Sequence, residues 1–462
     1  MSGMRKPGGS DTGDEGNEGD DGDDGDDGDD GDEGRNAGPD LKGSSDLAQR
    51  GIKTDGGRSQ QDIQPADRST LDRDGDGPAV AVVGGGAVGI TTAVDLAARG
   101  ARVTLFERDE LAAGSSGRAA GVLYDAYAED VDAALATRAM ERFRSLSDSL
   151  PGFSFTRCPY VIAVREGDPD ADAVPEMVER MRSHDLDVSV VNPAALGERF
   201  PVETDDLAVA AVAEGGGWTD PGSYVEAMGE RARGDGVSIE TGVEVALPDA
   251  EPTLHVDGEE RTFDAVVVAV GAHTARFLAD AGIAVPVKPY RVQALVSGRP
   301  YAGPMVYDAT AGVYLRAHPE GLLAGDGTVP READPDDYEP GGDDWFREET
   351  AAVLRERVDH DPEIDRAWAG LCTATPDGDP LVGPLAEGLF VAAGWQGHGF
   401  MRAPAMGEHV AEGVLATLEA GGDGGNRDSP WIDAFDPTRF DGDEEFEIRE
   451  GMTVRSRRGE NP

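Results

Sequence analysis

The stretch VVGGGAVGITTAVDLAARG, residues 82–100, limits the fold more than any other part of this 462-residue chain. An apolar run leads into the spacing Gly84-x-Gly86-x-x-Gly89, a segment with helical apolar spacing follows, and a second apolar run ends at Glu107. Strand, tight turn, helix and strand in this order are the fingerprint of a dinucleotide-binding βαβ unit. Gly84 permits the turn, Gly86 lets backbone approach a pyrophosphate, and Gly89 lets the helix pack on the strand.

The two ends of this unit offer complementary contacts to a dinucleotide. The N-terminus of the predicted helix presents unpaired N–H groups and a partial positive charge to phosphates. Glu107 follows Gly89 by eighteen residues, where a carboxylate can accept hydrogen bonds from the adenosine ribose. Arg108 comes next and is counted among the expected cofactor contacts. A glycine-rich turn in an unrelated α/β protein is the alternative, and the flanking strands and Glu107 argue against it.

The charge of the chain is strongly negative. The formal net charge is −51, and residues 1–40, with fifteen acidic and three basic side chains, carry −12 of it, so the rest of the chain is acidic too. Only four of the 41 basic residues are lysine. Such a surface is expected of a protein from a high-salt cytoplasm, where cations screen self-repulsion. It argues against nucleic acid and anionic membranes as partners.

The two cysteines, Cys158 and Cys372, form neither a disulfide framework nor a metal-binding set, so no metal is expected. No apolar run reaches the length of a membrane span, and no signal-peptide core precedes the fold. A cytoplasmic location is therefore expected. Residues 1–77 are acidic, of low complexity and poor in apolar side chains, which predicts disorder.

Alternating and helical patterns predict a discontinuous two-domain chain of the α/β class. A dinucleotide-binding domain takes residues 78–150, 205–284 and 366–422, and an antiparallel-sheet domain takes 151–204 and 285–365, followed by a charged tail, 423–462. The helix after Asp220, which can cap it, has Pro221 at its first position. Further expected helices are 131–150, 174–184, 345–358 and 403–418, and expected strands include 160–165, 237–240, 286–297 and 312–323.

Over roughly residues 79–420 the chain resembles the D-amino-acid oxidase/sarcosine oxidase superfamily of FAD-dependent oxidoreductases. The resemblance rests on the glycine loop with Glu107, and on GSSGRAAG, WTDP, AVGAH, PVKPYRVQ, TPD and GWQGHGFMRAP in this order. It implies a Rossmann-type, glutathione-reductase-like FAD-binding domain with an inserted α+β substrate domain whose sheet is antiparallel. It also implies that substrate lies between the flavin ring and that sheet.

The resemblance and the glycine patterns together suggest the cofactor contacts. The backbone at Gly394, Gly397, Gly399 and Phe400, at a helix N-terminus, is expected to stabilise the negative charge of a reduced flavin. His398 either donates to that charge or packs. The remaining expected contacts are Ser115, Ser116 and Arg118 in GSSGRAAG, with a surface ion pair as the alternative for Arg118, and Gly271 at the end of a strand.

Departures from the family affect the chemistry. Covalent-flavin members have a histidine where this chain has Arg118, and their linking cysteine would fall at Gly370, so non-covalent FAD is expected. The carboxylate-binding arginine of glycine and D-amino-acid oxidases would fall at Cys372. No lysine stands where the monomeric sarcosine oxidases have their oxygen-activating one, which favours a dehydrogenase over an oxidase. Lys288 is expected to be a surface residue.

Candidate substrate and catalytic residues follow from these segments. Arg291, Arg316 and Arg402 could each hold a carboxylate with a bidentate guanidinium, or could be ion-paired structural arginines. Tyr124, Tyr290 and Tyr314 could line the pocket or belong to the core. His398, Arg316 and Arg402 are the catalytic candidates, whereas His273 and His318 are expected to be structural.

The expected function is oxidation of the C–N bond of a small amine or amino acid, similar to sarcosine, dimethylglycine or proline, by hydride transfer to flavin N5, which gives an imine. An electron-acceptor protein is a possible partner in that case. Two alternatives stay open: a D-amino-acid or glycine oxidase that produces hydrogen peroxide, and an electron-carrying flavoprotein subunit of a complex. An NAD-dependent dehydrogenase is the weakest rival.

Overall fold

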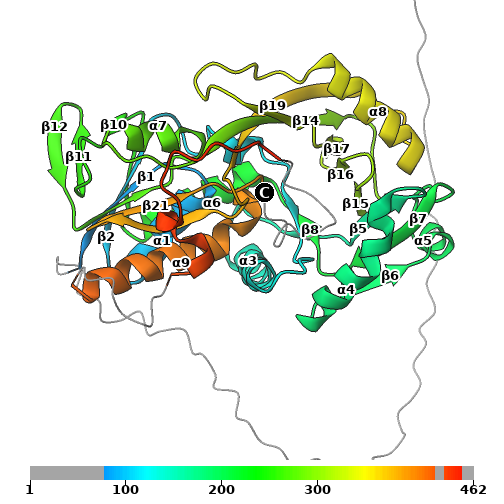
Figure 1. Cartoon of the computed structure of the whole chain (residues 1–462), viewed down its shortest axis with the longest axis horizontal. Helices are drawn as coiled ribbons and strands as arrows, with labels where there is room; N and C mark the ends of the chain where they lie inside the picture. Colours follow the sequence, from blue (N-terminus) through cyan, green and yellow to red (C-terminus); the bar gives the residue numbers. More distant parts are fainter. Residues whose placement is uncertain (1–76, 422–430, 450–462) are drawn as a thin grey trace, which may run out of the picture. The chain divides into compact units, whose positions relative to one another are not determined.

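The computed structural model describes residues 77–421 and 431–449, shown in colour in Figure 1. The predictions for residues 1–76 and for the tail segments 422–430 and 450–462 lie outside these residues. Within the described part, no helix combines the length and the apolar character needed to cross a membrane.

The described helices agree with the sequence patterns and extend several of them. Their bounds are α1 Ala87–Ala98, α2 Ser115–Arg118, α3 Asp130–Ser149, α4 Val174–Ser183, α5 Pro193–Arg199, α6 Pro221–Gly234, α7 Thr274–Ala279, α8 Asp344–Val358 and α9 Gly399–Glu419. At α6 the Asp220 side chain accepts a hydrogen bond from the Ser223 N–H and Pro221 opens the helix, as predicted. Helix α9 begins four residues before the expected Ala403, so it includes Arg402.

The first sheet has six strands in the order β20-β21-β13-β1-β2-β9. Its strands are β1 Ala79–Val83, β2 Arg102–Glu107, β9 Ser238–Thr241, β13 Ala265–Val268, β20 Leu381–Ala386 and β21 Leu389–Ala393. All neighbours are parallel except β20, which is antiparallel to β21. The strands β1 and β13 are almost completely buried on both faces, which explains their unbroken runs of Val and Ala.

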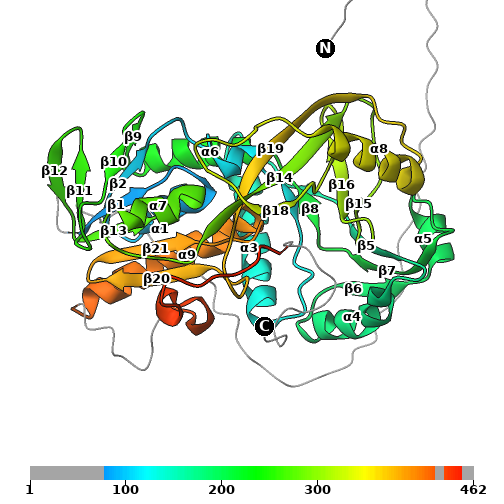
Figure 2. The ribbon, with the colours of Figure 1, turned by 45° about the horizontal axis from the view of Figure 1, so that its top comes forward.

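The second sheet is mostly antiparallel. It runs in the order β18-β14-β17-β16-β15-β5-β7-β6, with β19 paired to β14. Its strands are β5 Tyr160–Arg165, β6 Val188–Val191, β7 Leu207–Ala213, β14 Lys288–Ser297, β15 Met305–Asp308, β16 Val313–His318, β17 Gly321–Gly325, β18 Val329–Glu332 and β19 Ile364–Ala374. Figures 1 and 2 show β14 and β19 passing between the first sheet and strands β15–β17.

Two small sheets complete the described strands. One contains β10 Val245–Ala246, β11 Thr253–Val256 and β12 Glu259–Thr262; the other contains β3 Val122–Leu123, β8 Gly217–Trp218 and β4 Thr156–Arg157. Strands β7 and β19 lie in the second sheet, although the expected boundaries placed residues 205–284 and 366–422 with the dinucleotide-binding domain. Strand pairing therefore puts one domain boundary after β7 and another after β19, not before these strands. Local patterns did not distinguish strands of the two sheets.

The two faces of the second sheet have different neighbours. Leu295, Leu315 and Leu322 on one face form a core with Phe346 and Leu354 of α8. Because strand side chains alternate, the other face carries Tyr290 of β14, Tyr314 and Arg316 of β16, and Cys372 of β19. Tyr160, Met305 and Tyr307, also on that face, share a core with α1, α3 and α9. The polar face therefore lies toward the dinucleotide-binding half.

Candidate cofactor and substrate site

The carboxyl ends of the parallel strands bring the predicted cofactor residues to one edge of the first sheet. Adjacent strands β2, β1, β13 and β21 end at or just before Glu107, Gly84, Gly271 and Gly394. Open α/β sheets bind their ligands at this edge. The register therefore lines up four segments that are far apart in the sequence.

The glycine loop can be built only with glycine at two of its positions. Gly84 has a φ of +112°, and a Cβ there would overlap the carbonyl oxygen of Ala269. A Cβ at Gly89 would overlap the carbonyl oxygen of Gly84, so a side chain would push α1 off the strand. Gly86 directly precedes α1, and the Ala87 N–H donates to Oγ of Ser116 at 2.9 Å. The structure thus brings GSSGRAAG to the helix N-terminus.

Glu107 is fixed by the loop that it faces. Its Oε2 accepts a hydrogen bond from the Gly85 N–H at 2.7 Å, and its Oε1 accepts one from the Asp109 N–H at 3.0 Å. Each carboxylate oxygen can accept more than one hydrogen bond, so both can still receive a ribose hydroxyl. Arg108 instead pairs with Asp109 and with Asp336, at 3.3 and 3.4 Å.

The turn before α9 forms the other end of this edge. Gly394 and Gly397 have φ values of +79° and +82°, and the carbonyl oxygen of His398 accepts the first hydrogen bond of α9. Helix α9 has 21 residues and no acidic side chain in its first turn. Its N-terminal partial positive charge is therefore not neutralised by its own first turn.

These groups fit an FAD. A helix N-terminus capped only by a hydroxyl suits the pyrophosphate, Glu107 suits the ribose, and the start of α9 suits the electron-rich end of a flavin. At Gly271, with a φ of +56°, a Cβ would meet no atom within 4 Å, so the strand end borders open space. Glu107, Ser116 and the backbone of the two glycine turns are the groups that would hold the cofactor.

Two members of GSSGRAAG contact neighbouring backbone. Ser115 donates through Oγ to the Leu371 carbonyl oxygen of β19 at 2.6 Å, which ties α2 to the second sheet. Arg118 donates to the carbonyl oxygens of Ala113 and Gly114. Its guanidinium is therefore engaged with its own loop.

His398 lies among aromatic rings. The hydroxyl of Tyr124 lies 3.5 Å from its Nε2, and Tyr127 meets the imidazole edge to face. Tyr124 stacks between Tyr127 and Tyr160, and burial raises its pKa well above the ordinary value of 10.0. Tyr124 is therefore a neutral hydrogen-bonding group beside the turn that opens α9.

Arg402 approaches the same rings but is paired. Its Nη2 lies 2.8 Å from a carboxylate oxygen of Asp132 on α3, and its guanidinium covers the Tyr127 ring at 5.1 Å. The side chain is buried, and its Nε has no hydrogen-bond partner among the described residues. Arg402 thus joins α9 to α3 as an ion-paired structural arginine, which was the alternative to a carboxylate-binding role.

Arg316 is buried without an ion pair. It is 2% exposed, donates from Nε to the Ala120 carbonyl oxygen at 2.6 Å and from Nη1 to Ala317 O at 2.7 Å, and lies over the Trp218 ring. Within residues 77–421 and 431–449 no carboxylate lies within ion-pair distance, and Nη2 donates to no protein atom. Burial lowers its pKa to about 10, so it stays protonated at neutral pH.

The expectation for Arg291 as a substrate ligand is corrected. Its guanidinium donates to Asp343 at 3.2 Å and to the Gly341 carbonyl oxygen at 2.9 Å. Strand alternation puts its neighbour Tyr290 on the polar face and turns Arg291 to the side of α8. The PVKPYRVQ pattern contained this information, because adjacent residues of a strand cannot face the same site.

One carboxylate of this region was missed in the sequence. Asp326 directly follows β17, and burial raises its pKa to about 6 even though the Thr328 hydroxyl donates to it. It directly follows Gly325, which pairs with Tyr314 and at which a Cβ would overlap the Tyr314 hydroxyl, so Asp326 lies beside the polar face. Burial raises the Cys372 pKa to about 12, which leaves a neutral thiol. The run GLLAGDGT marks Asp326 only as a turn residue.

Comparison with known proteins agrees with this geometry. Residues 79–413 match the family described as FAD dependent oxidoreductase, abbreviated DAO. The chain belongs to this family. Its homologues are FAD-dependent flavoproteins, so its cofactor is FAD.

Individual relatives act on amino acids or amines. Glycine oxidase of Geobacillus kaustophilus is 28% identical over 72% of this chain and 92% of its own length. A tRNA 5-methylaminomethyl-2-thiouridine biosynthesis bifunctional protein of a Caulobacter species is 30% identical over 73% of this chain, which spans about half (54%) of that relative. The crystal structure of L-proline dehydrogenase from P. horikoshii superposes with a TM-score of 0.70 and 27% identity, over 79% of this chain and 98% of that chain. The chain is therefore an FAD-dependent oxidoreductase with relatives that oxidise CH–NH groups.

Proposed function

We propose that this protein oxidises the C–N bond of a small amino acid, preferably one with a secondary amine such as sarcosine or proline, and that Arg316 holds the substrate carboxylate. The observation that carries the proposal is a buried guanidinium that, among the described residues, has no carboxylate within ion-pair distance and leaves Nη2 unused. An unpaired buried charge is costly, and a bound carboxylate removes that cost. The similarity to L-proline dehydrogenase and glycine oxidase supports an amino-acid substrate.

The protein groups then have separate tasks. A bound FAD supplies the two-electron acceptor. Arg316 fixes the substrate through its carboxylate, so that the carbon bearing the amine is oriented by a group remote from the bond that breaks. Tyr124 and Tyr314 stay protonated because burial raises the pKa of both phenols, and each can donate one hydrogen bond. With FAD bound, the start of α9 and His398 would stabilise the negative charge that develops on the reduced flavin.

A dehydrogenase is favoured over an oxidase. Lys288 is the sole lysine of the described residues, and its Nζ donates to the Phe446 carbonyl oxygen at 3.0 Å and pairs with Glu445 at 3.4 Å. It is partly exposed, as expected of a surface lysine, and its ammonium lies over the Phe446 ring. The described part of the chain therefore offers no other lysine ammonium to promote the reaction of reduced flavin with oxygen.

The test is anaerobic bleaching of the flavin by glycine, D-alanine, sarcosine, dimethylglycine and L-proline at high KCl, followed by admission of oxygen. Sarcosine, dimethylglycine or proline should bleach the flavin fastest, and oxygen should restore the colour slowly. Arg316→Met should raise the substrate KM about tenfold to a hundredfold, the loss expected when a charge-assisted hydrogen bond to a carboxylate is removed.

The matched control is Arg291→Met, an arginine of the same sheet that faces α8. Its KM should stay within about twofold of the wild type. Rapid peroxide formation with glycine or D-alanine alone would replace the proposal with an oxidase. If no amine bleaches the flavin, the protein is an electron-carrying subunit instead.

A further inference from the structure

Arg316 has an acidic counterpart on the same face of the second sheet. Asp326 follows β17, the strand that pairs with the Arg316 strand β16, and is half-buried. No lysine, arginine or histidine of the described residues forms an ion pair with it; its bonding partner is the Thr328 hydroxyl. This acidic protein pairs most of its buried charges, as Arg357 with Asp308 and Asp206 shows. Two opposite, unpaired charges on one face are therefore an exception.

The two charges lie near each other on paired strands: Asp326 follows Gly325, which pairs with Tyr314, and Arg316 lies two positions further along β16, opposite Leu323. Tyr314, between them on β16, lies near enough to both for Asp326 to raise its pKa and Arg316 to lower it. Asp326 also acts on Cys372, whose Sγ lies 3.8 Å from the Cβ position of Gly397 in the turn before α9. Asp326 therefore lies at the end of this face near the turn before α9, whereas Arg316 lies at the end near Ala120 and Trp218.

We propose that Asp326 binds the ammonium group of the substrate while Arg316 binds its carboxylate, so that the site selects amino-acid zwitterions by pairing each pole with one buried charge. This rests on the proposed function. A proton passed from the bound ammonium to the Asp326 carboxylate leaves a neutral amine, whose nitrogen lone pair is then free to assist loss of hydride from the adjacent carbon. The proton stays on Asp326, and no further reactant is needed for this step.

The pH dependence follows from the groups around Asp326. Tyr314 of β16 and Cys372 of β19 are the titratable groups that act on it, and both stay neutral at pH 7 because burial raises their pKa values. Asp326 itself has a pKa of about 6. Its charge is therefore present above pH 6 and is lost as the pH falls below it, so amino-acid binding should weaken on acidification.

The experiment compares Asp326→Asn with Asp337→Asn, the same change at an exposed carboxylate eleven residues further on. Dissociation constants for glycine and for acetate are taken from the change in flavin absorbance. Acetate is not turned over, and glycine is titrated anaerobically. Asp326→Asn should raise the glycine constant about tenfold to a hundredfold and leave acetate binding unchanged or tighter, because only the ammonium contact is lost. Wild type and Asp337→Asn should bind glycine more weakly at pH 5 than at pH 7.5, and Asp326→Asn should not show this difference.

Equal weakening of glycine and acetate, or no effect on either, would overturn the role of Asp326. Acetate binding also reports that the variant is folded and holds its cofactor. The proposed function fails by a different outcome, the absence of flavin bleaching by every amino acid in the wild type. Glycine binding without bleaching would still test Asp326.

Discussion

Glu107 shows how one side chain can determine cofactor affinity. Its two oxygens accept hydrogen bonds from the N–H groups of Gly85, in the glycine loop after β1, and of Asp109, just after β2. An ionised carboxylate only accepts hydrogen bonds and has about four lone-pair sites, so it can accept these two bonds and bonds from ribose hydroxyls together. An amide at this position keeps one acceptor oxygen and presents an N–H group to the other donor.

We therefore expect Glu107→Gln to weaken FAD binding about tenfold to a hundredfold, the range for losing charge-assisted hydrogen bonds. FAD release is measured as the rise in flavin fluorescence after the protein is diluted. Glu110→Gln makes the same change at an exposed carboxylate and should release FAD at the wild-type rate. Equal retention by both variants would mean that Glu107 only shapes the turn.

At this scale the sequence predicted local backbone geometry better than the partners of side chains. Gly84, Gly89 and Glu107 lie as their spacing indicated, because the strand–turn–helix geometry leaves few alternatives. The ion-pair partners of Arg291 and Arg402 could not be assigned from the sequence, since Asp343 and Asp132 come from distant segments. Asp326 was missed because its burial depends on β16 and β19, which the local sequence does not specify.

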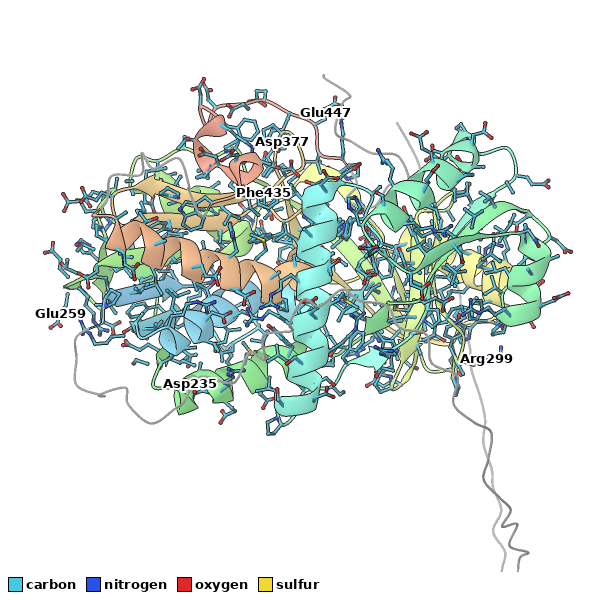
Figure 3. All side chains as sticks on the ribbon, turned by 90° about the horizontal axis from the view of Figure 1, so that it is seen from below. Asp235, Glu259, Arg299, Asp377, Phe435 and Glu447 are labelled. Atoms are coloured by element: carbon cyan, nitrogen blue, oxygen red, sulfur yellow. The ribbon has the colours of Figure 1, made fainter. Side chains whose placement is uncertain are left out.

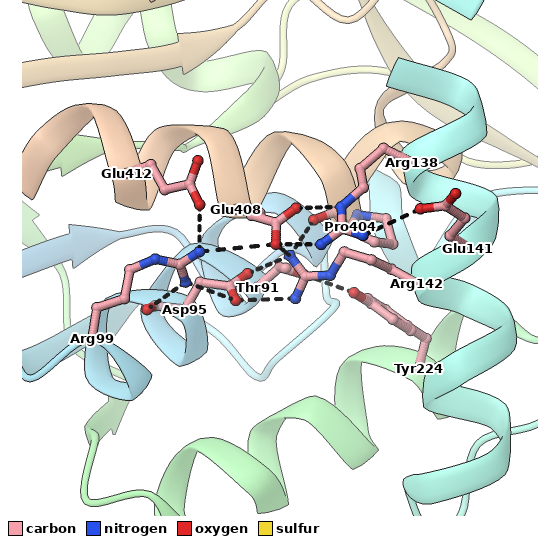
Figure 4. A network of polar contacts seen from close by, with 10 residues as sticks. All are labelled: Thr91, Asp95, Arg99, Arg138, Glu141, Arg142, Tyr224, Pro404, Glu408 and Glu412. Atoms are coloured by element: carbon pink, nitrogen blue, oxygen red, sulfur yellow. Dashed lines mark hydrogen bonds and ion pairs between the residues drawn. The ribbon is translucent and has the colours of Figure 1, made fainter. Parts of the chain in front are cut away.

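At the scale of elements, a charged network joins α1, α3 and α9 (Figure 4). Arg142 of α3 donates to both oxygens of Asp95 on α1, at 2.8 and 3.0 Å, and to the Pro404 carbonyl oxygen of α9 at 2.8 Å. Arg99 adds a contact from α1 to Glu412 of α9 at 2.7 Å. Since α1 and α9 begin at the two ends of the cofactor site, this network fixes the spacing of those ends.

Asp95→Ala should lower the free energy of unfolding by about 2 kcal/mol, because it leaves the largely buried Arg142 with only the more distant carboxylate of Glu408, at 3.7 Å. Chemical denaturation at fixed KCl measures this change. The control Glu141→Ala removes an exposed partner of Arg138 and should cost less than about 1 kcal/mol. Similar losses in both variants would show that the network contributes no more than surface pairs.

Element types were predictable, whereas sheet membership was not. The expected strand at residues 160–165 and helices near α3, α4 and α8 appear with nearly the same bounds, since their apolar spacing is local. β7 and β19 were assigned to the wrong half because their buried runs look alike in either sheet. Pairing of β19 with β14 joins residues about eighty positions apart, which no single-sequence pattern reports.

At the scale of the whole molecule, negative charge dominates the surface. Figure 3 shows exposed carboxylates such as Asp235, Glu259 and Glu447 projecting outward from separate elements. A net charge of −51 on 462 residues opposes the compact state by self-repulsion. Salt shortens the range of that repulsion from about 30 Å at 0.01 M to about 3 Å at 1 M. Screening also weakens surface ion pairs, but each of these contributes only about 0–1 kcal/mol.

The unfolding midpoint should therefore rise from low to multimolar KCl, as measured by thermal unfolding at constant pH. The double variant Glu259→Lys with Glu447→Lys changes two exposed positions and reduces the net charge to −47, because each reversal adds two positive charges to −51. It should unfold at a higher temperature than the wild type in low KCl, and the two should coincide in multimolar KCl. A difference that persists at high KCl would assign the effect to local contacts of the new lysines. A wild-type midpoint independent of KCl would show that self-repulsion does not limit this fold.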